Sequence, residues 1–250
     1  MIIAIILFVI LVLCLAGCKK PKPPPDPDPD PNPDPQPNPE DTWIAHYPIG
    51  YTIPLIDIQK LLWRDRTAQD LEQVDNVLIH FASENNRTDI DDLTLSLVLF
   101  TKVAGEYYFQ WTSDMQTWLL LDYWATPYQF VIDKEGKGDC DDFAGLHCYY
   151  LHELCKYYLT WWCEIYWQRK VTANGVDSWK GLGHAITIYK RSPESNWRCF
   201  SNQSLLGRTN GFETLEEIIR KFCPNDDDHR LLKVAARHPM TGKLLWERKG

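Results

Sequence analysis

The proline-rich tract at residues 21–40 constrains this chain more than any other feature. It consists almost entirely of Pro, Asp and Asn, with a proline at nearly every second position. Because proline lacks a backbone donor and fixes its own φ, the tract is excluded from helices and central strands and favours polyproline II. At roughly 3.1 Å per residue, about twenty such residues would reach on the order of 60 Å. We therefore interpret residues 18–41 as a linker and expect folding to be confined to residues 42–250.

An apolar run at residues 2–13 leads to small residues and then to Cys18. The run is long enough for a signal-peptide core and short for a membrane-spanning helix. Together they predict a bacterial lipoprotein signal at residues 1–17, cleaved before Cys18, whose thiol is then acylated. No Lys or Arg precedes the run, so a plain N-terminal membrane anchor is the alternative.

The expected location is the cell envelope, as a lipid-anchored membrane protein facing the periplasm or the cell surface. A diacyl group supplies two chains, which suffices for stable anchoring. The choice between inner and outer membrane stays open.

The composition favours one packed domain after the linker. Eleven Trp and twelve Tyr indicate a globule rather than disorder, and the length suits a single domain with a sizeable core. The net charge of −8, with no basic stripe, argues against nucleic acid as a partner. We expect a monomer.

Hydrophobic periodicity predicts both helices and strands. Helices are expected from a cap at Thr67 to Asn85, weakly over residues 90–100, for about four turns from Cys140, and over residues 214–222. Strands are expected over residues 161–168, 184–189, 197–200 and 231–236, with a chain break at residues 181–183 (Gly-Leu-Gly). The predicted fold class is α+β, with the helix of Cys140 packed on an antiparallel sheet.

Three positions could form a cysteine-based catalytic site. A thiol attacks a carbonyl only as a thiolate, which needs a helix N-terminus, a neighbouring base or both. Cys140 begins a predicted helix, and His184 opens a predicted strand. The next strand ends at Ser201 and Asn202, where a side chain could orient the imidazole. The interpretation is a Cys140–His184–Asn202 triad, with Ser201 as the alternative third residue.

The acids beside Cys140 oppose activation of its thiol. Asp139, Asp141 and Asp142 suit a helix N-terminus, yet their charge would raise the pKa of a neighbouring thiol. The task of activation therefore falls on His184. Helix capping is the simpler interpretation of the acids, and Ca²⁺ binding by clustered carboxylates is the alternative.

Residues 122–127 (Asp-Tyr-Trp-Ala-Thr-Pro), 138–144 (Gly-Asp-Cys-Asp-Asp-Phe-Ala) and 183–185 (Gly-His-Ala) resemble the bacterial transglutaminase-like cysteine peptidases of the papain-like superfamily. The resemblance covers roughly residues 100–205. It implies a papain-like or transglutaminase-like core, with Cys140 as nucleophile and His184 as general base and acid. It implies no required cofactor, although calcium is possible, because adhesin-releasing members bind it through acids in the places of Asp139, Asp141 and Asp142.

One departure from the resembled family concerns the third residue of the triad. The family usually has Asp where this chain has Ser201 and Asn202. Asn orients the imidazole in papain-type sites, so Asn202 is the favoured residue.

The leading functional hypothesis is an envelope cysteine hydrolase, a protease acting on protein or cell-wall peptide through a thioester. Acyl transfer or deamidation at glutamine by the same triad is an alternative. A non-catalytic lipoprotein that uses the same fold as a binding module is another. For the oxyanion, the candidate donors are the Cys140 backbone N–H and the side chains of Trp124 or Gln129. The cysteines expected to be small buried hydrophobes, with at most two disulfides among them, are Cys148, Cys155, Cys163, Cys199 and Cys223.

Overall fold

The computed structural model describes residues 68–117, 124–239 and 241–250. The predicted signal peptide at 1–17, Cys18, the linker at 18–41 and the cap at Thr67 lie outside these residues. Within the described ranges, no helix combines the length and the apolar character needed to cross a membrane.

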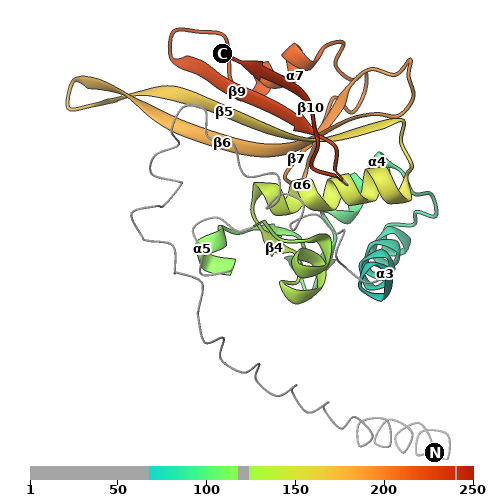
Figure 1. Cartoon of the computed structure of the whole chain (residues 1–250). Helices are drawn as coiled ribbons and strands as arrows, with labels where there is room; N and C mark the ends of the chain where they lie inside the picture. Colours follow the sequence, from blue (N-terminus) through green and yellow to red (C-terminus); the bar gives the residue numbers. More distant parts are fainter. Residues whose placement is uncertain (1–67, 118–123, 240) are drawn as a thin grey trace, which may run out of the picture. The chain divides into compact units, whose positions relative to one another are not determined.

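A six-stranded antiparallel sheet forms the larger half of the fold (Figure 1). Its strands in spatial order are β10 (Leu244–Lys249), β9 (His229–Arg237), β5 (Leu159–Ala173), β6 (Val176–Lys190), β7 (Arg198–Ser201) and β8 (Ser204–Leu206). β5 and β6 are the longest and pair along their whole length. A turn of two residues, Asn174 and Gly175, joins them, and its positive φ angles of 53° and 74° match the right-handed twist of a hairpin.

Helices and short strands make up the other half. The α-helices are α3 (Ala68–Glu84), α4 (Asp92–Val98), α5 (Asp114–Thr117), α6 (Cys140–Tyr149) and α7 (Leu215–Phe222). Two π-helical turns are η3 (Gln129–Asp133) and η4 (Tyr150–Leu154), of which η4 continues α6. The short strands β1 (Lys102–Val103) and β2 (Glu106–Tyr107) pair antiparallel, and β3 (Gln110–Trp111) and β4 (Lys137–Gly138) pair parallel.

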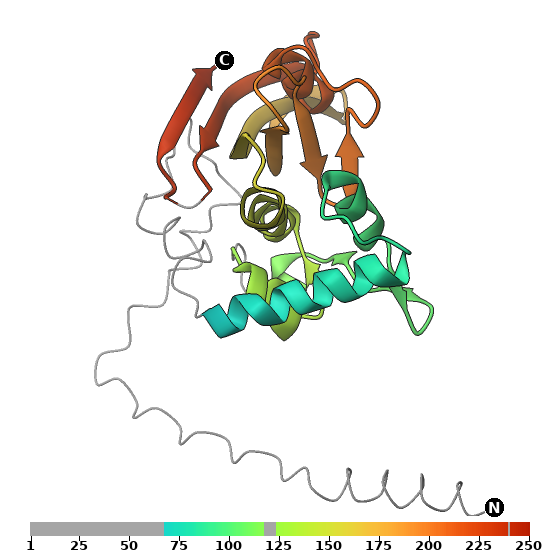
Figure 2. The ribbon, with the colours of Figure 1, turned by 90° about the vertical axis from the view of Figure 1, so that its right-hand side faces the viewer.

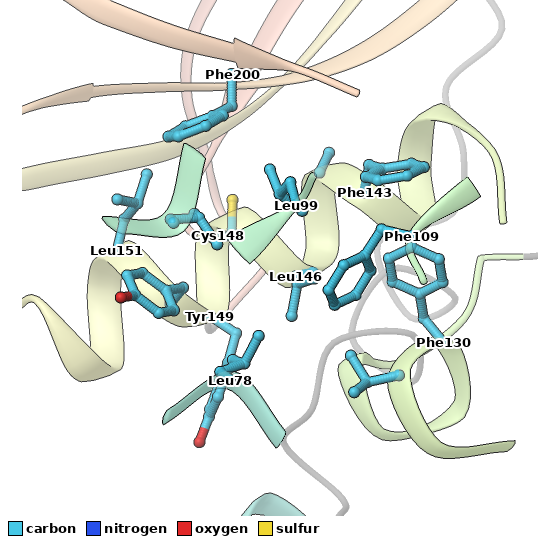
Figure 3. Packing of buried hydrophobic residues seen from close by; sticks show 14 of the residues in the cluster. Leu78, Leu99, Phe109, Phe130, Phe143, Leu146, Cys148, Tyr149, Leu151 and Phe200 are labelled. Carbon is cyan, nitrogen blue, oxygen red and sulfur yellow. The ribbon is translucent and has the colours of Figure 1, made fainter. Parts of the chain in front are cut away.

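The two faces of the sheet bury different apolar clusters. α6 lies between α3 and one face, and α7 covers the other (Figure 2). In the first cluster, Leu146 and Tyr149 of α6 point toward Leu78 of α3, and Phe200 of β7 lies on the sheet side of the helix (Figure 3). In the second cluster, Ile218 and Ile219 of α7 pack against the side chains of β5, β6 and β9 that point to the other face of the sheet. α6 is therefore buried on all sides, which fixes the position of its first residue.

The structure confirms the α+β class and most of the predicted elements. The helices begun at Cys140 and capped at Thr214 are present, and so are the helix over residues 92–98 and all four predicted strands. The predicted break at residues 181–183 is wrong, because β6 runs through these residues in unbroken register with β5. Pairing along the whole of β5 outweighs the weak strand preference of two glycines.

Candidate active site

Local sequence places Cys140 at the first position of α6. Asp139 is the N-cap: its carboxylate accepts the Asp141 N–H (3.4 Å), and its own N–H donates to Asp142 Oδ2 (3.3 Å), which forms a capping box. Gly138 is packed directly against this turn. A Cβ at Gly138 would lie 2.7 Å from the Asp142 Cβ, so the approach to the helix needs glycine there.

Asp142 also ties the start of α6 to the preceding segment. Its Oδ1 accepts the Ala125 N–H at 2.7 Å, and its side chain is fully buried. Burial, together with the charges of Asp139 and Asp114, raises its pKa well above the usual range, although the Ala125 hydrogen bond opposes the shift. The residue before Ala125, Trp124, stacks on Trp162 of β5 with ring centroids 5.2 Å apart.

The side chain of Cys140 faces the sheet. Thr187 of β6 donates to the Ala144 carbonyl (3.0 Å), and its Oγ1 lies 3.4 Å from the Cys148 Sγ. Cys140, Ala144 and Cys148 are spaced four apart and share one face of the helix. On β6 the residues that alternate with Thr187 toward α6 are Ala185 and Gly183.

His184 lies on β6 with the opposite orientation. Alternation groups it with Ile186 and Ile188 on the α7 face, where its ring lies 5.2 Å from the ring of Phe222. Its Nε2 is 2.8 Å from Ser201 Oγ on β7. When Nε2 carries the proton and donates it to Ser201, Nδ1 retains a lone pair that can accept a proton.

The electrostatics of His184 link it to the start of α6. Burial lowers the pKa of His184 to about 4, and the charge of Asp139 opposes this shift. The imidazole is therefore neutral at pH 7, the form that a general base requires. Asp139 directly precedes Cys140, so the charge that acts on His184 comes from the residue next to the candidate nucleophile.

Ser201, rather than Asn202, meets the imidazole. Asn202 is the first residue of the two-residue turn between β7 and β8, with φ of 47°. Its Oδ1 is buried with no hydrogen-bond partner, and the next residue, Gln203, donates to the Phe109 carbonyl. The sequence favoured Asn202, but strand alternation and the turn give the contact with His184 to Ser201.

The acids around Cys140 form two groups. Asp139, Cys140 and Asp141 have ligand atoms within 4.8 Å of one another, and so do Asp114, Asp139 and Asp142. Sequence reasoning missed Asp114, which reaches the site from α5, and no local pattern marks it. Both oxygens of Asp142 already accept backbone N–H groups, so capping accounts for this residue without a cation.

The remaining predicted residues have local structural contacts. Gln129 Oε1 accepts the Thr126 N–H at 3.0 Å, which engages the amide in its own turn. The Cys140 N–H belongs to the first turn of α6, whose amides lie outside the helical ladder. The cysteines of the described ranges are free thiols, so no disulfide forms among them.

No protein-family model matches the chain, and no curated protein matches it significantly.

Proposed function

We propose that the protein is a cysteine hydrolase, a protease of papain-like or transglutaminase-like fold, held in the cell envelope by a lipid on Cys18. Its substrate would be protein or cell-wall peptide. The proposal rests on the position of Cys140 at the start of α6 and on the neutral state of His184. Cys140 starts a buried helix, and the imidazole is held by Ser201 and affected by the charge of Asp139.

The chemistry follows from these positions. His184 takes the thiol proton as Cys140 Sγ bonds to the carbonyl carbon, and the oxyanion that forms is stabilised by helix-start N–H groups. His184 then gives the proton to the leaving amine as the C–N bond breaks, which leaves a thioester. Water attacks the thioester, His184 accepts its proton, and the thiol leaves with that proton. Ser201 positions the ring throughout.

The mechanism requires no cofactor. Asp114, Asp139 and Asp142 are of the donor type that Ca²⁺ prefers, and a cation would offset the repulsion among these acids. Because Asp142 is satisfied by backbone N–H groups, we propose that the acids act first as the cap of α6, with calcium as an accessory ligand at most.

One observation favours a non-catalytic binding module as the second candidate. α6 covers one face of β6, whereas the ring of His184 packs on the other face against Phe222. For catalysis the imidazole of His184 would have to reach Cys140 around the outer edge of β6. Gly183, the neighbouring residue on that strand, has no side chain to obstruct this path. Acyl transfer and deamidation use the same groups and differ only in whether an amine or water attacks the thioester.

The test is alkylation of the full-length protein with an iodoacetamide probe between pH 5 and 9, with Cys140 followed by mass spectrometry. In wild type we expect Cys140 to react well below pH 8. His184→Ala should slow this reaction at pH 6.5 by at least about tenfold, as expected for loss of a general base. The matched control is His152→Ala, a partly buried histidine of η4, which should leave the rate within about twofold.

Labelling of Cys140 only above pH 8, with no effect of His184→Ala, would leave the binding module as the function. Incorporation of a fluorescent primary amine into a glutamine-containing protein would assign acyl transfer instead of hydrolysis. For the anchor, metabolic labelling with palmitate should give a lipidated product that Cys18→Ser abolishes.

A further inference from the structure

The outer edge of β6 is unpaired over most of its length among the described residues. β7 pairs only with residues 187–189 of β6, and residues 177–185 of β6 pair with β5 alone. Gly181 and Gly183 on this stretch are exposed. The edge therefore presents backbone groups beside a position that β7 would occupy if it were longer.

The register fixes which backbone groups point outward. A two-residue turn makes Ala173 and Val176 a mutually hydrogen-bonded pair. In an antiparallel ladder such pairs alternate, so even-numbered residues of β6 bond to β5 and odd-numbered residues point away from it. The N–H and C=O groups of Gly181 and Gly183 therefore point away from β5.

This edge lacks the protection that the other edges of the sheet have. β10 carries exposed charges at Glu247, Arg248 and Lys249, and β8 is only three residues long. Charged side chains and short length are common means of preventing edge pairing. Residues 181–185 of β6 (Gly-Leu-Gly-His-Ala) have neither a permanent charge nor a proline.

The unprotected stretch adjoins the candidate active site. It contains His184 and leads to Ala185, which faces the helix of Cys140. A chain beside Gly183 would continue the line of β7 beyond Ser201. Its alternate side chains would point to the α6 face and to the face of His184.

Resting on the proposed function, we propose that an extended polypeptide binds along β6 as an added antiparallel or parallel strand, hydrogen-bonded to Gly181 and Gly183. The substrate class is then an unfolded or flexible peptide segment, selected first by its backbone. Strand addition of this kind derives affinity from main-chain hydrogen bonds. The glycines suit it because they place no Cβ beside the incoming chain.

The probe is a tetra-alanine chloromethyl ketone, in which Cys140 Sγ displaces chloride and forms a thioether. We compare its rate of reaction at Cys140 with that of iodoacetamide. Three further probes each replace one amide N–H by an ester oxygen, which removes one donor without adding bulk. Because only alternate residues of a strand face its neighbour, the rate should fall roughly three- to tenfold at alternate amides. At the intervening amide it should not fall.

The matched protein variants are Gly181→Pro and Gly181→Ala. A Cβ at Gly181 would meet nothing within 4 Å, and proline is tolerated where the N–H faces outward at an edge. Relative to iodoacetamide, the peptide probe should react roughly three- to tenfold more slowly with Gly181→Pro than with Gly181→Ala. Thermal melting of both variants checks that the hairpin is retained.

Equal sensitivity at every amide, or none at any, would overturn the proposal, and so would equal rates in the two Gly181 variants. A dimer in solution that blocks the probe would assign this edge to a second copy of the chain and overturn it too. Failure of the proposed function is distinguishable, since it appears as His184-independent reaction with iodoacetamide. In that case anisotropy of a fluorescent tetra-alanine with Cys140→Ala protein, measured for the same ester series, tests the edge without a reactive thiol.

Discussion

Two buried acidic centres in this protein differ in how their charge is balanced. Asp92, at the start of α4, is fully buried and accepts hydrogen bonds from Arg191, Arg198 and Tyr189. Burial alone would raise its pKa, but the hydrogen bonds and charges of these partners lower it below the usual value. Asp92 thereby joins α4 to β6 and β7.

The acids at the start of α6 have no such partners among the described cations. Burial raises the pKa of Asp141 well above its usual range, and Asp139, Asp142 and Cys140 raise it further. One of its oxygens, Oδ2, is buried without a hydrogen-bond partner. A carboxylate held at a cost in stability points to function, whereas a compensated one such as Asp92 serves the fold.

The largest expected effect comes from breaking the compensated centre. Asp92→Ala should lower the free energy of unfolding by about 3–5 kcal/mol, because it leaves two arginines near the core without their carboxylate. Urea unfolding followed by tryptophan fluorescence measures the change. The control is Asp89→Ala, which removes an exposed acid paired with Arg87 and should change stability little. Equal effects of the two variants would contradict a structural role for Asp92.

A smaller loss is expected from crowding the start of α6. Gly138→Ala places a methyl group against the Asp142 side chain and should cost about 1–3 kcal/mol, typical of overpacking. Gly181→Ala is the matched control, since its added Cβ meets nothing within 4 Å, and its melting temperature should stay close to that of wild type. A Gly138→Ala protein as stable as Gly181→Ala would show that the turn before Cys140 is not tightly packed.

These contrasts show which parts of the molecule the sequence could predict. Local signals found the start of α6, since Asp139 caps its own helix, and periodicity found α3 and the strands. The continuity of β6 was missed because its glycines are held in the strand by pairing with β5, the other strand of the hairpin. The Asn174–Gly175 dipeptide, a strong hairpin signal, marks that pairing.

Local sequence patterns could not predict the contacts between residues that are far apart in the sequence. Asp92 accepts hydrogen bonds from arginines about a hundred positions away, and no pattern near Asp92 in the sequence predicts these partners. Ser201 replaced Asn202 beside His184 because the side-chain direction depends on where the β7–β8 turn begins. A shift of one residue there would exchange the two side chains.

Substitution of an acid at the start of α6 should raise the free energy of unfolding, whereas substitution of Asp92 should lower it. Asp141→Asn replaces a buried carboxyl group, which burial and neighbouring acids disfavour in its charged form, by a neutral amide that can donate to Asp139. We expect a gain on the order of 1 kcal/mol at pH 7.5, of the size that stabilising substitutions commonly give, together with altered reactivity of Cys140. Chemical denaturation and iodoacetamide rates measure the two. Asp227→Asn, an exposed acid, controls for net charge, and loss of stability in Asp141→Asn alone would show that the charge is compensated after all.

A difference in the pH dependence of stability is expected between the two sides of the site. The pKa of His184 is about 4 in the folded protein and near 6.5 when unfolded, so the unfolded chain binds more protons between these values. Its contribution to stability is present above pH 6.5 and is lost as the pH falls toward 4. For Asp141, whose folded pKa is raised, the contribution falls as the pH rises above its usual value.

Unfolding free energies of His184→Phe, Asp141→Asn and wild type between pH 4 and 8 separate the two contributions. Relative to wild type, His184→Phe should gain stability as the pH falls from 6.5, and Asp141→Asn should gain as the pH rises. Each variant is compared with wild type at the same pH because burial also lowers the pKa of His147, to about 3. His147 therefore makes the same pH-dependent contribution to the stability of all three proteins. Parallel pH profiles for all three would mean that neither group has a shifted pKa, and would contradict the burial of both groups as the cause of the shifts.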